Sequence, residues 1–272
     1  MLRLQEKCES ETLGLMAVYV DDFMLMTPDG EMKEAFSREL QKIWRMFTTV
    51  SLTPSTPIMF LGLEIEIYQT GDMLIHQKTF TRQLLTKHGI DKMSKPMTAI
   101  QMSTPETSDK PPTPKQLKEL QGYAGEFNWL ATRTRCDLSY YTSVIASTAT
   151  KYAEWTLQLC KKVLRYLCGT VETGQRFVRG GDPSQLVTWS DAGYGGVGTK
   201  AQTGVLISWG GNVMTWRSSR QSSPALSTCE AEVAAAAMAF QITEGLRFLL
   251  EEWGVRFQLT ILYSTTKVHL SR

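Results

Sequence analysis

The sequence lacks any pair of cysteines in metal-binding or redox spacing. Its five cysteines are odd in number and far apart, so no C-x-x-C unit is present for a zinc site or a redox-active disulfide. This usage is typical of reduced, structural cysteines in an intracellular protein rather than of a secreted disulfide scaffold. The five are Cys8, Cys136, Cys160, Cys168 and Cys229.

Signals for secretion and for the membrane are also missing. The first residues do not show the charged and apolar regions of a signal peptide, and we find no apolar run long enough to cross a bilayer. We therefore expect an intracellular protein that is not secreted and has no membrane partner. The sequence does not distinguish the cytoplasm from the nucleus.

An excess of charge of one sign is absent as well. The 29 Lys and Arg stand against 27 Asp and Glu, for a formal net charge of +2, which neither requires nor excludes a nucleic-acid partner. Locally, residues 151–180 are basic. Within a predicted helix there, Lys161, Lys162 and Arg165 form a candidate phosphate-binding surface. A solvated face on a packed helix is the alternative interpretation.

A phosphate-binding loop is missing too. The glycines between residues 193 and 198 do not form the G-x-x-x-x-G-K-[ST] pattern, and a glycine-rich hairpin between two strands explains them. The three histidines have no metal-ligand spacing and are interpreted as structural. Arg133 and Arg135 are candidates either for contact with a nucleic-acid backbone or for ordinary surface positions.

What is present is enough apolar sequence for a sizeable core. The chain has 272 residues, of which 42% are hydrophobic, and this length predicts one or two domains. Hydrophobic periodicity predicts a mixed α/β fold. Expected helices span residues 30–47, 79–88, 114–130, 138–150, 154–168 and 228–253; expected strands span 13–20, 23–26, 58–68, 73–76, 186–189, 204–209, 212–216 and 257–263.

Two adjacent carboxylates interrupt an apolar stretch near the start of the chain. Residues 17–26 read AVYVDDFMLM, which puts Asp21 and Asp22 at the turn of a predicted hairpin. Divalent metals take hard oxygen ligands, and two metals about 4 Å apart assist phosphoryl transfer. A solvated Asp-Asp turn is the alternative for the dipeptide alone.

The surroundings of this pair resemble the Pol polyprotein of copia-type (Ty1/copia) retrotransposons. YVDD at residues 19–22 resembles the Y-x-D-D box of reverse transcriptases, and further segments of the family follow in order. They are FLGLEI at 60–65, IHQKTF at 75–80, WLATRTRCD at 129–137 and VLRYLCGT at 163–170. Their ordered succession over nearly the whole chain carries the resemblance.

The resemblance implies roles for the hairpin. Asp21 would bind a catalytic metal with Asp22 in support, and Tyr19 and Val20 would lie near the primer end and the incoming nucleotide. The family's third carboxylate comes from an upstream strand, and the twenty residues before Asp21 match no such motif. We therefore expect that this chain alone does not synthesise DNA, and that the missing polymerase segment is a candidate partner.

The last third resembles the family's ribonuclease H domain. WSDAGY at residues 189–194 and ALSTCEAEV at 225–233 carry this match. It implies Asp191 as one metal ligand. Glu232 is preferred over Glu230 as the second, because a capping box with Ser227 would occupy Glu230. Solvated first-turn acids are the alternative for both glutamates.

This second site is expected to be incomplete. The family pattern Y-S-D-x-K places a further aspartate where Thr265 stands here, and a hydroxyl is a poor magnesium ligand. The resemblance implies Mg²⁺ as cofactor, with Mn²⁺ as a substitute, and RNA, DNA and RNA–DNA hybrid as partners. Whether the chain is an enzyme is left open. The alternative is a catalytically inactive remnant that at most binds nucleic acid through backbone charge.

The resemblance also implies a domain organisation. Residues 1–95 would be the C-terminal part of a reverse-transcriptase palm with a thumb-like helix. Residues 96–113 would be a proline-rich linker. Residues 114–180 would form a helical connection, and residues 181–272 a truncated ribonuclease H-like domain with a mixed sheet and one long helix.

Overall fold

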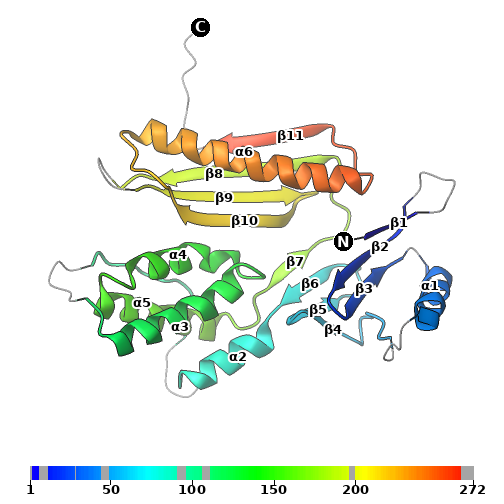
Figure 1. Cartoon of the computed structure of the whole chain (residues 1–272), viewed down its shortest axis with the longest axis horizontal. Helices are drawn as coiled ribbons and strands as arrows, with labels where there is room; N and C mark the ends of the chain where they lie inside the picture. The colour runs from blue at the N-terminus through cyan, green and yellow to red at the C-terminus, as the bar shows by residue number, and fades with distance from the viewer. Residues whose placement is uncertain are drawn as a thin grey trace, which may run out of the picture.

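The computed structural model describes residues 2–5, 12–27, 29–43, 49–90, 96–105, 111–195 and 200–264. In these ranges the chain forms three β-sheets and six α-helices (Figure 1). This arrangement confirms the expected mixed α/β class. The three sheets are described in chain order below.

The first sheet contains the predicted hairpin. Its strands β1 (Leu2–Gln5), β2 (Thr12–Tyr19) and β3 (Asp22–Met26) are antiparallel, in the order β1-β2-β3. Helix α1 (Gly30–Ile43) follows. Residues 44–48, which the sequence prediction included in this helix, lie outside the described residues.

The second sheet joins segments that are far apart in sequence. Strands β4 (Ile58–Phe60), β5 (Leu63–Ile67) and β6 (Met73–His76) form an antiparallel meander. A fourth strand, β7 (Gln175–Phe177), pairs with β6 and completes the order β4-β5-β6-β7. The sequence analysis did not predict β7. Helix α2 (Lys78–Lys87) begins directly after β6.

The turn between β4 and β5 explains two letters of the FLGLEI segment. Phe60 pairs with Leu63, so Leu61 and Gly62 form a two-residue turn. Both have positive φ, 52° and 74°, which is the type I′ geometry that matches strand twist. A glycine suits the second position because it has no Cβ to clash in this conformation.

Gly62→Ala is therefore expected to destabilise the protein by about 1–2 kcal/mol. The alanine would adopt a left-handed conformation, and its Cβ would lie 3.3 Å from Trp129 Cζ2. Urea unfolding of the two proteins measures the difference. Gly122→Ala is the matched control, since Gly122 lies within a helix with open space around it, and alanine there should stabilise by about 0.5–1 kcal/mol. Equal effects at both positions would contradict the prediction.

A helical unit follows the second sheet. It consists of α3 (Pro114–Ala131), the short 3-10 helix η1 (Cys136–Leu138), α4 (Ser139–Thr148) and α5 (Ala153–Gly169). Thr113 and Gln116 cap α3 reciprocally, which satisfies donors that the first helical turn leaves open. All three predicted α-helices of this region are confirmed.

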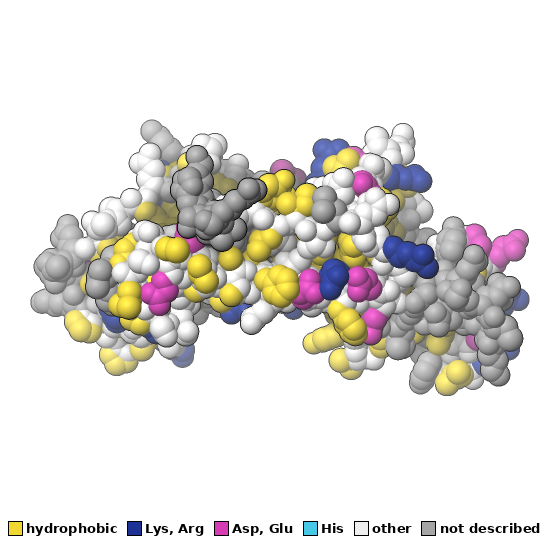
Figure 2. Space-filling view, turned by 90° about the horizontal axis from the view of Figure 1, so that it is seen from above, with side chains coloured by type: hydrophobic (Ala, Val, Ile, Leu, Met, Phe, Trp, Pro, Cys, Tyr) yellow, Lys and Arg dark blue, Asp and Glu magenta, His cyan; other side chains and the backbone are white. Residues whose placement is uncertain are grey.

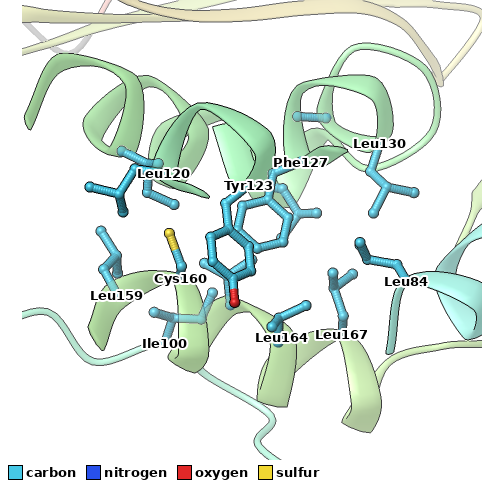
Figure 3. Packing of buried hydrophobic residues seen from close by; sticks show 14 of the residues in the cluster. Leu84, Ile100, Leu120, Tyr123, Phe127, Leu130, Leu159, Cys160, Leu164 and Leu167 are labelled. Atoms are coloured by element: carbon cyan, nitrogen blue, oxygen red, sulfur yellow. The ribbon is translucent and has the colours of Figure 1, made fainter. Parts of the chain in front are cut away.

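The largest hydrophobic core lies between α3 and α5. Figure 3 shows Phe127 and Tyr123 of α3 packed over the side chains of α5, with Leu84 entering from α2. Ile100 contributes from the segment 96–105, whose Met97 N–H also donates to Arg165 O at 3.1 Å. These residues of the predicted linker therefore pack against α5.

The third sheet combines antiparallel and parallel pairing. Strands β8 (Gln185–Gly193), β9 (Gln202–Trp209) and β10 (Asn212–Arg220) are antiparallel, and β11 (Leu259–Ser264) pairs in parallel with β8. The order is β10-β9-β8-β11. The connection from β10 to β11 contains the long helix α6, and Figure 1 shows this helix lying along one face of the sheet.

Helix α6 (Thr228–Glu252) approaches the sheet through small side chains. Its buried residues recur every four positions over three turns, which places them on one stripe. They are Ala231, Ala235, Ala239 and Thr243. Thr243 Oγ1 lies 2.7 Å from Thr188 Oγ1 of β8, so the two hydroxyls satisfy each other in a buried position.

Helix α6 also corrects the sequence prediction on apolar length. It contains an 18-residue window with a mean hydropathy of 1.3, so by length and composition it qualifies as a membrane span. The helix nevertheless packs on β8 and β9, and the core helix of a globular protein passes the same test. Figure 2 shows hydrophobic side chains along its outer face, where Val233, Phe240 and Phe248 are exposed.

Polar contacts join the third sheet to the rest of the chain. Trp216 Nε1 of β10 donates to Ala131 O at 2.6 Å, and Gln202 Nε2 of β9 donates to Ser143 Oγ of α4 at 3.0 Å. Val178, directly after β7, exchanges two hydrogen bonds with the side chain of Asn212. The helical unit thus faces the side of the sheet opposite to α6.

Candidate nucleic-acid and metal sites

The hairpin between β2 and β3 presents the predicted YVDD residues to solvent. Tyr19 pairs with Asp22, which leaves Val20 and Asp21 as the turn. All four side chains are exposed, and Val20 has a φ of 54°. Positive φ is strained for a β-branched residue, and such outliers concentrate at functional sites. The hairpin itself is confirmed, while its predicted role in binding metal and primer stays a prediction.

Asp191 lies near the end of β8 on an exposed face. Burial alternates along this strand: Thr188 and Ser190 are buried toward α6, whereas Trp189 and Asp191 are exposed. Trp189 stacks on Tyr263 of the neighbouring strand, with ring centroids 6.1 Å apart and an interplanar angle of 16°. Asp191 therefore shares a sheet face with an exposed aromatic pair.

The first turn of α6 separates the two candidate glutamates. Ser227 Oγ accepts a hydrogen bond from the Glu230 N–H at 3.1 Å, and Glu230 Oε2 accepts one from the Leu226 N–H at 2.6 Å. The capping role predicted for Glu230 is confirmed, although its carboxylate reaches the residue before the N-cap. Glu232 is half-buried, with one carboxylate oxygen buried.

Packing brings Asp191 and Glu232 to the same end of this unit. Their chain neighbours Ala192 and Ala231 belong to one small cluster with Ala201 and Ala225. Gln221 fixes the helix start there, because its Nε2 donates to Ala231 O at 2.7 Å and to Thr203 Oγ1 at 3.1 Å. The alternation of β8 turns Asp191 to the face away from α6, so the two carboxylates flank the end of the strand from different sides.

The described residues do not complete a two-metal site. Among them, no three His, Cys, Asp or Glu residues come together as a group able to hold a metal ion. Thr265, the position of the family's next aspartate, lies outside the described residues. Two carboxylates supply too few oxygen ligands for a pair of magnesium ions, so the described part of the chain does not fit that cofactor set alone.

The basic surface predicted on α5 is partly used inside the protein. Lys162 Nζ donates to Gln101 O at 3.0 Å, and the indole of Trp155 donates to Ser103 O at 3.1 Å. Tyr166 OH donates to Asp137 at 2.8 Å. Lys161 is exposed and Arg165 is half-buried. Nucleic-acid binding by these residues stays a prediction.

Arg135 corrects the sequence interpretation, which considered a nucleic-acid contact or a surface position. It is only 1% exposed. Its guanidinium contacts Asp137 Oδ2 at 2.8 Å and donates to Thr170 O at 3.0 Å and Thr170 Oγ1 at 2.7 Å. Burial would raise the pKa of Asp137, but the hydrogen bonds and charge of Arg135 outweigh it and lower that pKa. Arg135 is therefore structural.

Several family segments contact one another in the fold. Gly62 of FLGLEI faces Trp129. Gln77 of IHQKTF accepts a hydrogen bond from Thr134 Oγ1 at 2.9 Å, and Arg135 joins the same segment to Thr170. These residues carry the sequence resemblance, and their contacts are internal. The signal that sequence reasoning missed was that the segments pair with each other.

Three relatives define what the chain is similar to. It is 28% identical over 249 residues to a retrovirus-related Pol polyprotein from transposon RE1 of Arabidopsis thaliana, covering 90% of this chain and 16% of that protein. It is 26% identical over 270 residues to the one from transposon TNT 1-94 of Nicotiana tabacum, covering 95% of this chain and 20% of that protein.

The third relative is of similar length to this chain. An uncharacterized mitochondrial protein of Arabidopsis thaliana is 24% identical over 229 residues, covering 82% of this chain and 90% of that protein. No protein-family model matches the sequence. The chain thus spans a fifth or less of the two polyproteins, and the alignments extend over most of its own length.

Proposed function

The chain belongs to the copia-type retrotransposon Pol family, and from this premise we propose that it is the reverse transcriptase–ribonuclease H region of such a polyprotein. The ordered segments from residue 19 to residue 233 support this assignment. Activities of a whole Pol polyprotein enter here only as proposals, because the chain spans a small part of those relatives.

The ribonuclease H-like part is the unit formed by β8–β11 and α6. The observation that carries it is the meeting of Ala192 and Ala231 in one cluster, since this brings Asp191 and Glu232 to the same end of the unit. We propose these two carboxylates as the chain's contribution to a divalent-cation site. Mg²⁺ or Mn²⁺ bound there would activate water for hydrolysis of the RNA strand of an RNA–DNA hybrid.

The polymerase part is the hairpin with Asp21 and Asp22. In the proposal these acids serve metal binding during RNA-directed DNA synthesis, and Tyr19 and Val20 contact the primer end. The exposed position of all four residues supports access by a nucleic acid. Catalysis by several carboxylates is strongly non-additive, so the chain alone is expected to give no primer extension with Mg²⁺.

The cation site is tested by Mn²⁺ binding to the full chain. Asp191→Asn and Glu232→Gln are each expected to weaken Mn²⁺ affinity by about tenfold or more, because each removes a charged oxygen ligand. Glu230→Gln is the matched control: it removes an equal charge from the same helical turn, where the side chain serves the cap. Titration calorimetry gives the affinities. Equal weakening by all three variants would refute the site.

A second candidate function is nucleic-acid binding without cleavage. It is favoured by the lack of any three-acid group among the described residues. Incubation with a labelled RNA–DNA hybrid, in Mg²⁺ and then Mn²⁺, distinguishes the two. Cleavage that Asp191→Asn abolishes supports the enzyme, whereas hybrid binding with no cleavage supports the inactive remnant.

A further inference from the structure

A polar pocket lies where the helical unit meets the third sheet. Its volume is about 310 Å³. One wall comes from α4 and the turn after it, and the other comes from the neighbouring ends of β8, β9 and β10. The lining residues are Tyr140, Val144, Ser147, Thr148, Lys151, Tyr152, Gly193, Lys200, Gln202 and Arg220.

The charged residues of this pocket are all basic. Lys151 comes from the helical wall, Lys200 precedes β9 and Arg220 ends β10, and the lining contains no Asp or Glu. All three cations are exposed. In the part of the chain that the structure describes, none of them forms an ion pair. Three uncompensated cations around one concavity attract an anionic ligand.

The rest of the lining favours a nucleic-acid strand among anionic ligands. Tyr140 is exposed and Tyr152 is half-exposed, and aromatic rings beside cations stack bases while the cations bind phosphates. The cations come from both walls, which suits a chain of repeated charges better than a single phosphate. The rigidity needed is present, because Gln202 holds the walls together by donating to Ser143 Oγ at 3.0 Å.

The pocket continues toward Asp191. Gly193 lines it and lies two residues beyond Asp191 on β8, which is roughly 6–7 Å along a strand. Residues two apart on a strand share a face, so Asp191 is on the same side as the pocket. A strand of nucleic acid seated in the pocket would pass this carboxylate within one or two nucleotides.

We propose that this pocket binds adjacent phosphates of one nucleic-acid strand through Lys151, Lys200 and Arg220, without a metal ion. The site is separate from both carboxylate sets and from the basic surface on α5. The proposal deepens the proposed function, on which its choice of nucleic acid rests. Its role would be to hold the strand that passes Asp191.

The test measures binding of a fluorescent single-stranded DNA oligonucleotide to the full chain by anisotropy, in EDTA. The variant Lys151→Gln/Arg220→Gln is expected to weaken binding at least tenfold and to reduce the salt slope by about two, one for each lost phosphate contact. The control Lys115→Gln/Lys118→Gln removes equal charge from exposed positions on α3 and should change affinity less than twofold. Thermal melting by circular dichroism verifies that both variants fold.

Three results would overturn the inference. The first is no binding by the unsubstituted chain at low salt in EDTA, and the second is equal weakening by the pocket and control variants. The third is competition by a poly-glutamate peptide of equal charge as strong as by unlabelled oligonucleotide, which would indicate an acidic protein ligand instead. Because no metal is present, each outcome is independent of the Mn²⁺ and cleavage results at Asp191.

Discussion

Arg135→Met is expected to destabilise the protein by about 3–5 kcal/mol, the cost of removing one partner from a buried ion pair. Methionine retains much of the volume but none of the donors. Asp137 would lose its partner at 2.8 Å, and two acceptors of Thr170 would lose theirs. Only the hydroxyl of Tyr166 would still donate to the carboxylate. Urea unfolding followed by circular dichroism measures the loss.

The effect of Arg135→Met should depend on pH. The pKa of Asp137 is lowered in the folded protein, so its contribution is present above its unfolded pKa of about 3.9 and is lost as pH falls through the lower folded value. Without Arg135, burial raises that pKa, and protonation near pH 4 relieves the unpaired charge. The destabilisation should therefore be smaller at pH 4 than at pH 7.

Arg133→Met is the matched control for this prediction. Arg133 is exposed and lies over the Trp129 ring at 4.9 Å, a contact worth about 0.5–1 kcal/mol at an exposed site. Its loss should not depend on pH in this range. A destabilisation below 1 kcal/mol for Arg135→Met, or one that does not change between pH 4 and 7, would show that the buried pair is not structural.

Phe127→Ala is expected to cost about 3–5 kcal/mol, the range for emptying a fully buried aromatic site. Phe127 is 0% exposed and lies between α3 and α5 (Figure 3). Its ring stacks on Tyr123 at a centroid distance of 5.8 Å, and burial raises the pKa of Tyr123 to about 12. Neither helix can move inward freely, because each also packs on other elements.

Phe248→Ala tests whether this effect depends on burial. Phe248 is 64% exposed on α6, so its replacement should change stability by no more than about 0.5 kcal/mol. Both variants are compared by urea unfolding with the same slope analysis. A loss at Phe127 no larger than the loss at Phe248 would contradict the assignment of the core to the α3–α5 contact.

The sequence was sufficient for the elements whose signals are local. Helices α3, α5 and α6 have a regular apolar stripe, and α3 and α6 also have caps. The two-residue turns at Val20–Asp21 and Leu61–Gly62 fix hairpins within a few residues. Such elements are predictable because residues close in sequence determine them.

What could not be predicted depends on distant partners. β7 has three residues and becomes a strand only by pairing with β6. Arg135 reads as a surface residue until Asp137 and Thr170 surround it. The pocket beside Gly193 likewise combines α4 with three strand ends. For the candidate site, sequence named Asp191 and Glu232, but only the Ala192–Ala231 cluster places them at one end.

The late strand β7 has a consequence for synthesis on the ribosome. β6 ends at His76, and β7 begins at Gln175, so about 100 residues must emerge before the two can pair. At roughly 5–20 residues per second this takes about 5–20 s. During that time one edge of the nascent sheet has open backbone donors and acceptors, which are prone to wrong pairing. We expect chaperone dependence to be greatest in chains stalled between residues 77 and 174.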